Sequence, residues 1–168
     1  MVVAAGSWSE LRAVAATDLQ ACTEFSCCVR ARRFGAVDIQ RQVRTGKAFR
    51  RTLLEHDHRF LGAFDEAGNL AAVAYHEPAP HEQVGVMARY LRFIALADAR
   101  QRRGEGSRLL HATHDAICAE YRGTEAVLVR VHPQHATSIS LIDQNAYVRV
   151  PQDSGADPLF IRALCSDT

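Results

Sequence analysis

The sequence predicts an α/β fold in which helices cover both faces of a mixed, mostly antiparallel sheet. Apolar segments at 59–64 and 70–75 flank a short glycine-containing turn, a pattern typical of a β-hairpin. An aromatic and apolar segment at 89–97, an amphipathic one at 107–121 and an apolar one at 126–131 then predict strand, helix and strand. A hairpin followed by such a unit requires both antiparallel and parallel neighbours in one sheet.

The N-terminal part adds a strand and two helices. Residues 10–14 predict a short first strand. A helix begins at Leu19 and runs toward Val29, because a side-chain oxygen of Thr17 or Asp18 can accept a hydrogen bond from an unpaired helical amide.

A second helix follows Asp38, another capping residue, and has apolar positions between Ile39 and Leu54 and a weak point at Gly46. After the hairpin, prolines and a glycine between 78 and 85 mark a loop. The last elements are a helix at 135–145 and a strand at 159–164.

Composition indicates one ordinary globular domain spanning residues 1–168, with 48% hydrophobic and 23% charged residues. A net charge of +1 gives no general electrostatic reason to expect nucleic acid as a partner. No segment approaches the roughly 20 apolar residues that cross a bilayer, and the first residues lack a basic leader pattern. We therefore expect a cytoplasmic protein without a membrane partner.

The 5 cysteines are odd in number and form no paired Cys-x-x-Cys sets, which argues against a disulfide framework and against a zinc site. No metal ligand set is predicted. The adjacent Cys27 and Cys28 have two readings, a redox-active pair or buried helix cysteines, and the second is favoured.

The most informative segment is the turn between the strand at 89–97 and the helix after it. Two glycines allow the backbone to approach a ligand closely, two arginines add positive charge, and the first helical amides point outward without partners. These features predict a pyrophosphate-binding loop made of Gln101, Arg102, Arg103, Gly104, Glu105, Gly106 and Ser107. The alternative is an ordinary strand-to-helix turn in which the glycines serve geometry alone.

This loop differs from both well-known phosphate loops. A P-loop requires Lys followed by Ser or Thr after its second glycine, where this chain has Ser107 and Arg108. The dinucleotide fingerprint requires a third glycine and a later acidic residue, and this chain has neither.

The loop resembles instead the acetyl-coenzyme A loop of the GNAT N-acetyltransferase superfamily, with its pattern Gln/Arg-x-x-Gly-x-Gly/Ala. Residues 131–148 are similar to a second GNAT signature, in which a strand ends in a Val-x-Pro turn and a helix and a further strand follow. His135 stands where Asn is usual, and Ala146–Tyr147 stands for Gly-Phe. The resemblance covers nearly the whole chain and implies a GNAT-like acyl-CoA N-acyltransferase fold.

The resemblance also implies where acetyl-CoA lies, namely in a split between two strands that diverge. By position, the backbone of Ile94, Ala95 and Leu96 would pair with the pantetheine arm. Residues 101–107 would hold the pyrophosphate, and His135 would contact the pantetheine arm.

The catalytic residues depart from the family pattern. Many members have a tyrosine that is thought to protonate the thiolate, and Ile142 occupies that position. Ser138, one turn earlier, is the substitute candidate, although a hydrogen bond from its side chain to its own backbone at the helix start is the favoured reading. Candidate bases are His132 and Glu77, each at a strand end, with His76 beside Glu77.

Three further polar residues have simpler interpretations. His111 and His114 are expected on the solvated face of their helix. Glu105, where the family usually has an aliphatic residue, is expected to point to solvent, because it would weaken phosphate binding if it turned inward.

The resulting hypothesis is an acetyl-CoA-dependent N-acetyltransferase that transfers an acetyl group to a primary amine of a small molecule, peptide or protein. Its partners are acetyl-CoA and the amine acceptor, and a homodimer is a possible assembly. The alternatives are a catalytically silent acyl-CoA-binding or regulatory domain and, less favoured, a toxin-type acetyltransferase of charged tRNA.

Overall fold

The computed structural model describes residues 7–27, 38–79, 85–152 and 157–164. Its strands are β1 (Arg12–Ala13), β2 (Arg59–Phe64), β3 (Leu70–Pro78), β4 (Ala88–Leu96), β5 (Ala126–Arg130), β6 (Val148–Val150) and β7 (Leu159–Ala163). Its α-helices are α1 (Leu19–Thr23), α2 (Ile39–Arg44), α3 (Lys47–Leu54), α4 (Glu105–Glu120) and α5 (Ala136–Gln144). Short 3-10 turns, η1 (Ala16–Asp18) and η4 (Asp98–Arg100), precede α1 and follow β4.

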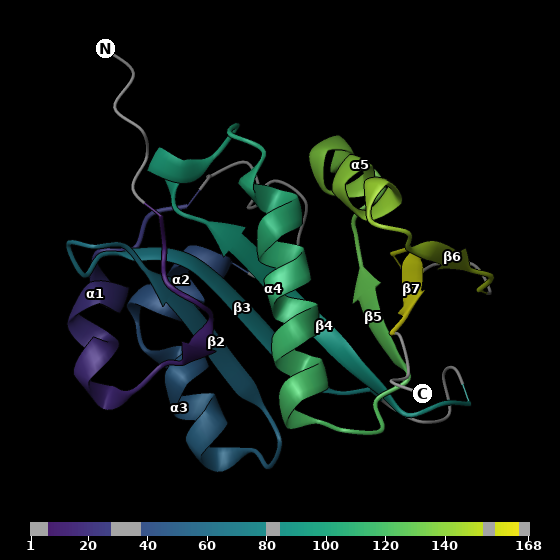
Figure 1. Cartoon of the computed structure of the whole chain (residues 1–168), viewed down its shortest axis with the longest axis horizontal. Helices are drawn as coiled ribbons and strands as arrows, with labels where there is room; N and C mark the ends of the chain where they lie inside the picture. Colours follow the sequence, from purple (N-terminus) through teal and green to yellow (C-terminus); the bar gives the residue numbers. More distant parts are fainter. Residues whose placement is uncertain (1–6, 28–37, 80–84, 153–156, 165–168) are drawn as a thin grey trace.

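The strands form one seven-stranded sheet in the order β1-β2-β3-β4-β5-β7-β6. β4 and β5 are parallel, and the other neighbouring strands are antiparallel. The predicted mixed, mostly antiparallel sheet is therefore confirmed. The parallel pair arises because α4 carries the chain from one end of the sheet back to the other between β4 and β5 (Figure 1).

Helices cover both faces of the sheet, as predicted. On one face α1, α2 and α3 bury apolar side chains, including Val43, against Phe60, Tyr75 and Phe93. On the other face α4 packs against β4, the central strand, and α5 lies at the end of β5 (Figure 1). The main contributors to this second layer are Leu91, Leu110, Ile117, Val127, Ile142 and Phe160.

The first helix is shorter than predicted. It begins at Leu19 as expected but ends at Thr23, and the chain then buries Phe25 and Cys27. Asp18 does not cap α1 through its side chain; its carboxylate accepts a 2.7 Å hydrogen bond from the backbone N–H of Ala15 and pairs with Arg12. Val29 and Cys28 lie outside the described residues.

The second predicted helix is divided at the expected weak point. Asp38 caps α2 by accepting a 3.1 Å hydrogen bond from the backbone N–H of Arg41. Gly46 has φ +70, a left-handed value that L side chains rarely adopt, and α3 starts directly after it. The glycine thus turns one apolar segment into two helices that both pack on the sheet.

His114 corrects the expectation of a solvated helix face. It is buried, together with Leu109, Leu110, Thr113 and Ile117 of α4, whereas His111 is exposed as expected. Two side chains from distant positions in the chain bond its ring, which sequence periodicity alone does not reveal. Tyr147 bonds Nε2 at 2.6 Å, and Arg162 lies 2.9 Å from Nδ1.

Candidate active site

The candidate site lies where the two parallel strands separate. Among the described residues, β4 and β5 pair from Ala88 and Ala126 up to Tyr90 and Leu128. β4 then continues to Leu96 beside β3, while β5 ends at Arg130 beside β7. A cavity of about 130 Å³ opens between them. The expected divergence of the two strands is confirmed.

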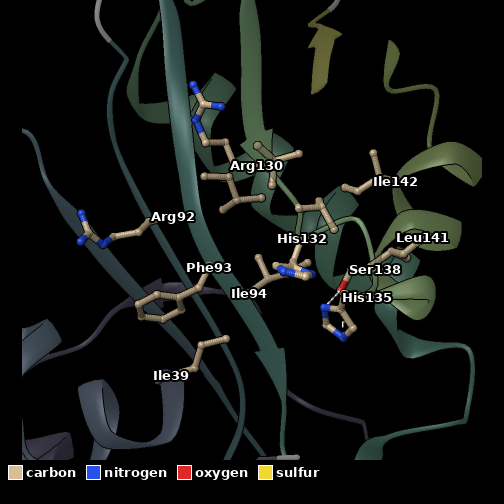
Figure 2. A pocket seen from close by; sticks show the side chains of 13 residues that line it. Ile39, Arg92, Phe93, Ile94, Arg130, His132, His135, Ser138, Leu141 and Ile142 are labelled. Carbon is tan, nitrogen blue, oxygen red and sulfur yellow. Dashed lines mark hydrogen bonds between the residues drawn. The ribbon is translucent and has the colours of Figure 1, made fainter. Parts of the chain in front are cut away.

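A β-bulge in β4 shapes one wall of this cavity. Tyr75 of β3 lies opposite Phe93, and the next residue, His76, lies opposite Leu91, so Arg92 has no partner in the register. A bulge re-aims the side chains around it. Arg92 and Phe93 consequently lie on the same side of β4, the side of α2 (Figure 2).

The cavity brings together four of the predicted site residues, Ile94, His132, His135 and Ser138 (Figure 2). Ile94 belongs to β4, His132 follows β5, and the other two lie at the start of α5. Ala95 and Leu96 are not among the described residues that line it; their side chains pack against core clusters on opposite faces of the sheet.

Ser138 and His135 form a hydrogen-bonded pair inside the cavity. The Ser138 Oγ lies 2.7 Å from Nδ1 of His135 (Figure 2). The hydroxyl therefore bonds an imidazole ring of the site. Burial, with a smaller contribution from His132, lowers the pKa of His135, so its ring is neutral at neutral pH and can exchange a proton with the hydroxyl.

Ile142 occupies the wall next to this pair. This residue of α5 is 3% exposed. Its side chain packs in the core between the helices α4 and α5 and the sheet, and it also lines the cavity. An aliphatic group in this place adds an apolar surface and no proton donor.

Among the described residues, Glu77 and the buried His76 do not line the cavity, whereas Ser138 and His132 do. The Glu77 carboxylate is 3.3 Å from Nδ1 of His58 and 3.4 Å from Nη1 of Arg92. It therefore reaches the cavity through Arg92, which does line it. His58 also bonds the Tyr75 hydroxyl at 2.9 Å.

Sequence reasoning missed Arg92, Arg130 and His58. Arg92 and Arg130 both line the cavity, one from each diverging strand. No sequence signal marks Arg92, because strict alternation does not reveal a bulge. His58 precedes β2 and meets Glu77 only through the pairing of β2 with β3.

The predicted pyrophosphate loop forms the N-terminal end of α4. Gly104 precedes the helix at φ +73, and a Cβ there would meet nothing within 4 Å. Arg102 has φ +60, an uncommon value for a residue other than glycine, which costs roughly 1–2 kcal/mol. Arg102 and Arg103 are exposed. The loop therefore combines backbone strain, open space and two cations beside the free amides of a helix start.

Other residues of the loop fix its position. The side-chain amide of Gln101 donates a 3.0 Å hydrogen bond to the carbonyl of Leu96, so the loop folds back on the end of β4. A Cβ on Gly106 would lie 3.4 Å from Leu141, which lines the cavity. The Ser107 hydroxyl accepts a 3.0 Å hydrogen bond from the buried Asn145 at the end of α5. These contacts hold the loop next to the cavity.

Glu105 corrects the expectation that it points to solvent. Its carboxylate accepts a 2.9 Å hydrogen bond from Nε1 of Trp8 and lies 3.8 Å from the guanidinium of Arg100. The side chain is only 15% exposed. Trp8 thus holds the negative charge against the body of the protein.

Within the described residues, no cluster of His, Cys, Asp or Glu has an arrangement that could hold a metal ion. The helices described are also too short or too polar to cross a membrane. Cys22 and Cys27 are buried, whereas Cys118 on α4 is exposed.

Solved structures of N-acetyltransferases resemble this one closely in backbone and distantly in sequence. The PaiA N-acetyltransferase of Thermoplasma acidophilum, solved with coenzyme A, gives a TM-score of 0.68 at 17% identity over 94% of this chain and 99% of its own. A GNAT superfamily phosphinothricin acetyltransferase of Sinorhizobium meliloti, solved with AcCoA, gives 0.66 at 18% identity, covering 94% of this chain and 88% of its own.

Spermidine N-acetyltransferase of Vibrio cholerae, solved with CoA and spermine, gives 0.68 at 12% identity, covering 91% of this chain and 94% of its own. No protein-family model matches the sequence, and no curated protein matches it. At these identities the likeness concerns the architecture, and on that basis the chain has the fold of the GNAT superfamily of N-acetyltransferases.

Proposed function

We propose that this protein is an acetyl-CoA-dependent N-acetyltransferase that acts on a primary amine of a small molecule, peptide or protein. The observation that carries the proposal is the cavity between β4 and β5, with the Gly104 loop at its side. Where β4 and β5 separate, the unpaired edge of β4 is open to hydrogen bonds from the arm that carries the thioester. The paired part of the two strands closes the other end of the cavity. The adjoining helix start gives a pyrophosphate unpaired amides.

The residues of the loop fit this co-substrate. Backbone amides from Gly104 to Ser107 would bind the pyrophosphate, and the exposed Arg102 and Arg103 would add positive charge. Gln101 would act by holding the loop on β4. The β5-facing edge of β4, at Ile94 to Leu96, would hold the pantetheine arm, with His135 opposite.

The transfer would be direct. The amine nitrogen bonds to the thioester carbonyl carbon, the carbon–sulfur bond breaks, the amine loses a proton, and the coenzyme A thiolate gains one. An alkylamine has a pKa of ~10.4, so about one molecule in a thousand is neutral at pH 7. A base and an acid near the reacting atoms therefore accelerate the reaction.

The described side chains supply candidates for both roles. Ser138 would protonate the departing thiolate, and the bonded ring of His135 would restore the proton of the hydroxyl from one nitrogen while it takes up a proton from water at the other. His132, which lines the same cavity, would accept the proton of the amine. Glu77, which contacts Arg92 and His58, would be an outer proton acceptor.

A catalytically silent acyl-CoA-binding domain is the second candidate, and the buried Ile142 in place of a proton donor supports it. Both candidates require the co-substrate to bind. The acceptors named for the similar structures, phosphinothricin and spermidine, differ, so the fold does not select the amine.

Calorimetric titration and release of free thiol test the proposal together. Acetyl-CoA is expected to bind with micromolar affinity, to raise the melting temperature, and to release thiol when an accepted amine is added. Gly104→Val is expected to abolish binding in a folded protein, because it puts a branched side chain at a positive φ beside the phosphate site.

Gly123→Val is the matched control, because Gly123 also has positive φ with nothing within 4 Å of its Cβ, but lies beyond the other end of α4. Its effect on folding is expected to match that of Gly104→Val, without loss of binding. Absence of binding to the wild-type protein at millimolar acetyl-CoA would refute the proposal. Binding without thiol release from any amine would favour the silent domain.

A further inference from the structure

The cavity walls carry an excess of positive charge. Arg92 and Arg130 line the cavity from the two diverging strands, whereas no Asp or Glu is among the described residues that do. A cavity made for a polyamine needs carboxylates to balance the ligand's charge. This cavity has the opposite character.

Arg130 is held by groups without charge. Its Nη1 donates to the side-chain oxygen of Gln152 at 2.9 Å and to the backbone carbonyl of Asp157 at 2.8 Å. Among the described residues it forms no ion pair. These two bonds orient the guanidinium and leave its charge available to a ligand.

Glu77 orients Arg92 but uses only one of the nitrogen atoms of its guanidinium. Its Nη1 lies 3.4 and 3.5 Å from the two Glu77 oxygens, and no other described residue bonds its guanidinium. A guanidinium has five N–H donors in a planar fork, so Nε and Nη2 remain for a carboxylate. The side chain is 30% exposed and therefore accessible.

Tyr90 of β4 lies close enough to Arg92 and Arg130 for both guanidiniums to act on its phenol. It pairs with Glu77 on β3 and with Leu128 on β5, and its phenol is influenced by Arg130, Glu77, Arg92 and Asp157. Burial is the largest effect and raises its pKa, so the phenol keeps its proton and can donate a hydrogen bond.

Arg92 also faces the side from which an acceptor would arrive. It lies across β4 from the Ser138–His135 pair, next to Phe93 and Ile39 (Figure 2). The loop at the start of α4 contacts α5, on the Ser138 side. A thioester that enters beside α4 and α5 therefore meets an amine that enters beside Arg92.

We infer that the acceptor is an amine that also carries a carboxylate, that Arg92 binds this carboxylate at the open side of the cavity, and that Arg130 adds positive charge to the same cavity. The inference rests on the proposed acetyl-CoA-dependent function. Amino acids and peptides with a free carboxylate near the amine are the matching substrate class, and polyamines are excluded by charge.

Conjugates of coenzyme A test this without knowledge of the natural acceptor. The sulfur carries CH2–CO–NH–R, where R is carboxymethyl, carboxyethyl or carboxypropyl, with uncharged ethyl and cationic aminoethyl for comparison. At least one carboxylate conjugate is expected to bind tenfold or more tightly than the ethyl conjugate, and the aminoethyl conjugate more weakly than ethyl. The preference should shrink with added salt.

Variants assign the preference to residues. Arg92→Gln is expected to reduce the carboxylate preference to less than threefold, Arg92→Lys to keep part of it, and Arg130→Gln to reduce it by a smaller factor. Arg149→Gln, at an exposed arginine of β6, is the control that should retain it. The dissociation constant of acetyl-CoA should stay within about twofold throughout.

The binding measurements distinguish failure of this inference from failure of the proposed function. Equal affinity for all conjugates, tightest binding of the aminoethyl conjugate, or an undiminished preference in Arg92→Gln and Arg130→Gln would overturn the inference while the proposed function stands. Failure of acetyl-CoA and of every conjugate to bind would overturn the proposed function itself.

Discussion

The indole of Trp8 and the carboxylate of Glu105 are joined by a 2.9 Å hydrogen bond across a separation of 97 positions in the chain. Glu105 is the first residue of α4 and stands between the two glycines of the candidate pyrophosphate loop. A carboxylate at a helix start favours the helix but repels a bound phosphate. The contact with Trp8 keeps the helix-stabilising charge and directs it away from the loop.

Glu105→Gln is expected to raise the affinity for acetyl-CoA by about two- to fivefold at low ionic strength. The amide oxygen still accepts the Trp8 hydrogen bond, while the charge beside the phosphate site is lost. Isothermal titration at low and at high salt measures the effect, which should decrease as salt is added.

The control for this change is Glu120→Gln at the last residue of α4, where Glu120 pairs with Arg59. A 16-residue helix is about 24 Å long, so this charge is screened from the loop. An unchanged or weaker affinity in Glu105→Gln would show that the carboxylate does not act on the phosphate site.

Ser138→Ala is expected to lower kcat by about 10²–10⁴ with little change in the dissociation constant of acetyl-CoA. The variant removes the hydroxyl that bonds His135 at 2.7 Å inside the cavity. His135→Asn, which keeps a polar group but cannot relay a proton, should lower kcat as well. Steady-state kinetics with an accepted amine measure both.

Ser140→Ala, at an exposed serine of the same helix, should retain wild-type kcat. If Ser138→Ala also retains it, the hydroxyl is not the acid. The enzyme would then act mainly by positioning its two substrates in the cavity, where Ile142 contributes an apolar wall.

Acid is expected to destabilise the protein through His114. Nδ1 of this ring accepts from the Arg162 guanidinium, which can only donate, so Nε2 carries the proton and donates to the Tyr147 hydroxyl. Burial, and then Arg162, lowers the pKa of His114 to about 3. The ring is therefore neutral in the folded protein.

Below pH ~6.5 the unfolded chain binds a proton at this histidine that the folded protein excludes, so the free energy of unfolding falls as pH decreases toward 3. The maximum slope for one such group is about 1.4 kcal/mol per pH unit. His76, whose pKa burial also lowers to about 3, acts in the same direction.

Urea unfolding between pH 7.5 and 5.5 measures this effect. His114→Gln should lower the stability at pH 7.5 and reduce the slope below pH 6.5. His111→Gln, at an exposed position of the same helix, should leave the slope as it is. Equal slopes in wild type and His114→Gln would contradict a neutral buried His114.

Local patterns in the sequence were sufficient for most elements of the fold. Alternating and apolar segments identified the hairpin of β2 and β3 and the strands β4 and β5, because side-chain periodicity is a property of neighbouring residues. Asp38 and Gly46 marked a helix start and a break for the same reason, since capping and positive φ are decided within one turn. The order of these elements, with the Gly104 loop, also predicted the strand separation through the family resemblance.

Tertiary structure alone added the arginines to the site, beside the predicted Ile94, His132, His135 and Ser138. The bulge that turns Arg92 toward the open side depends on the register of β3 against β4, and the presence of Arg92 and Arg130 in the wall of one cavity depends on where β4 and β5 separate. Trp8 holds Glu105, and Arg162 and Tyr147 hold His114, from distant parts of the chain. Burial and pairing between remote residues follow from packing, so they set the charge and the protonation of this site although no local pattern encodes them.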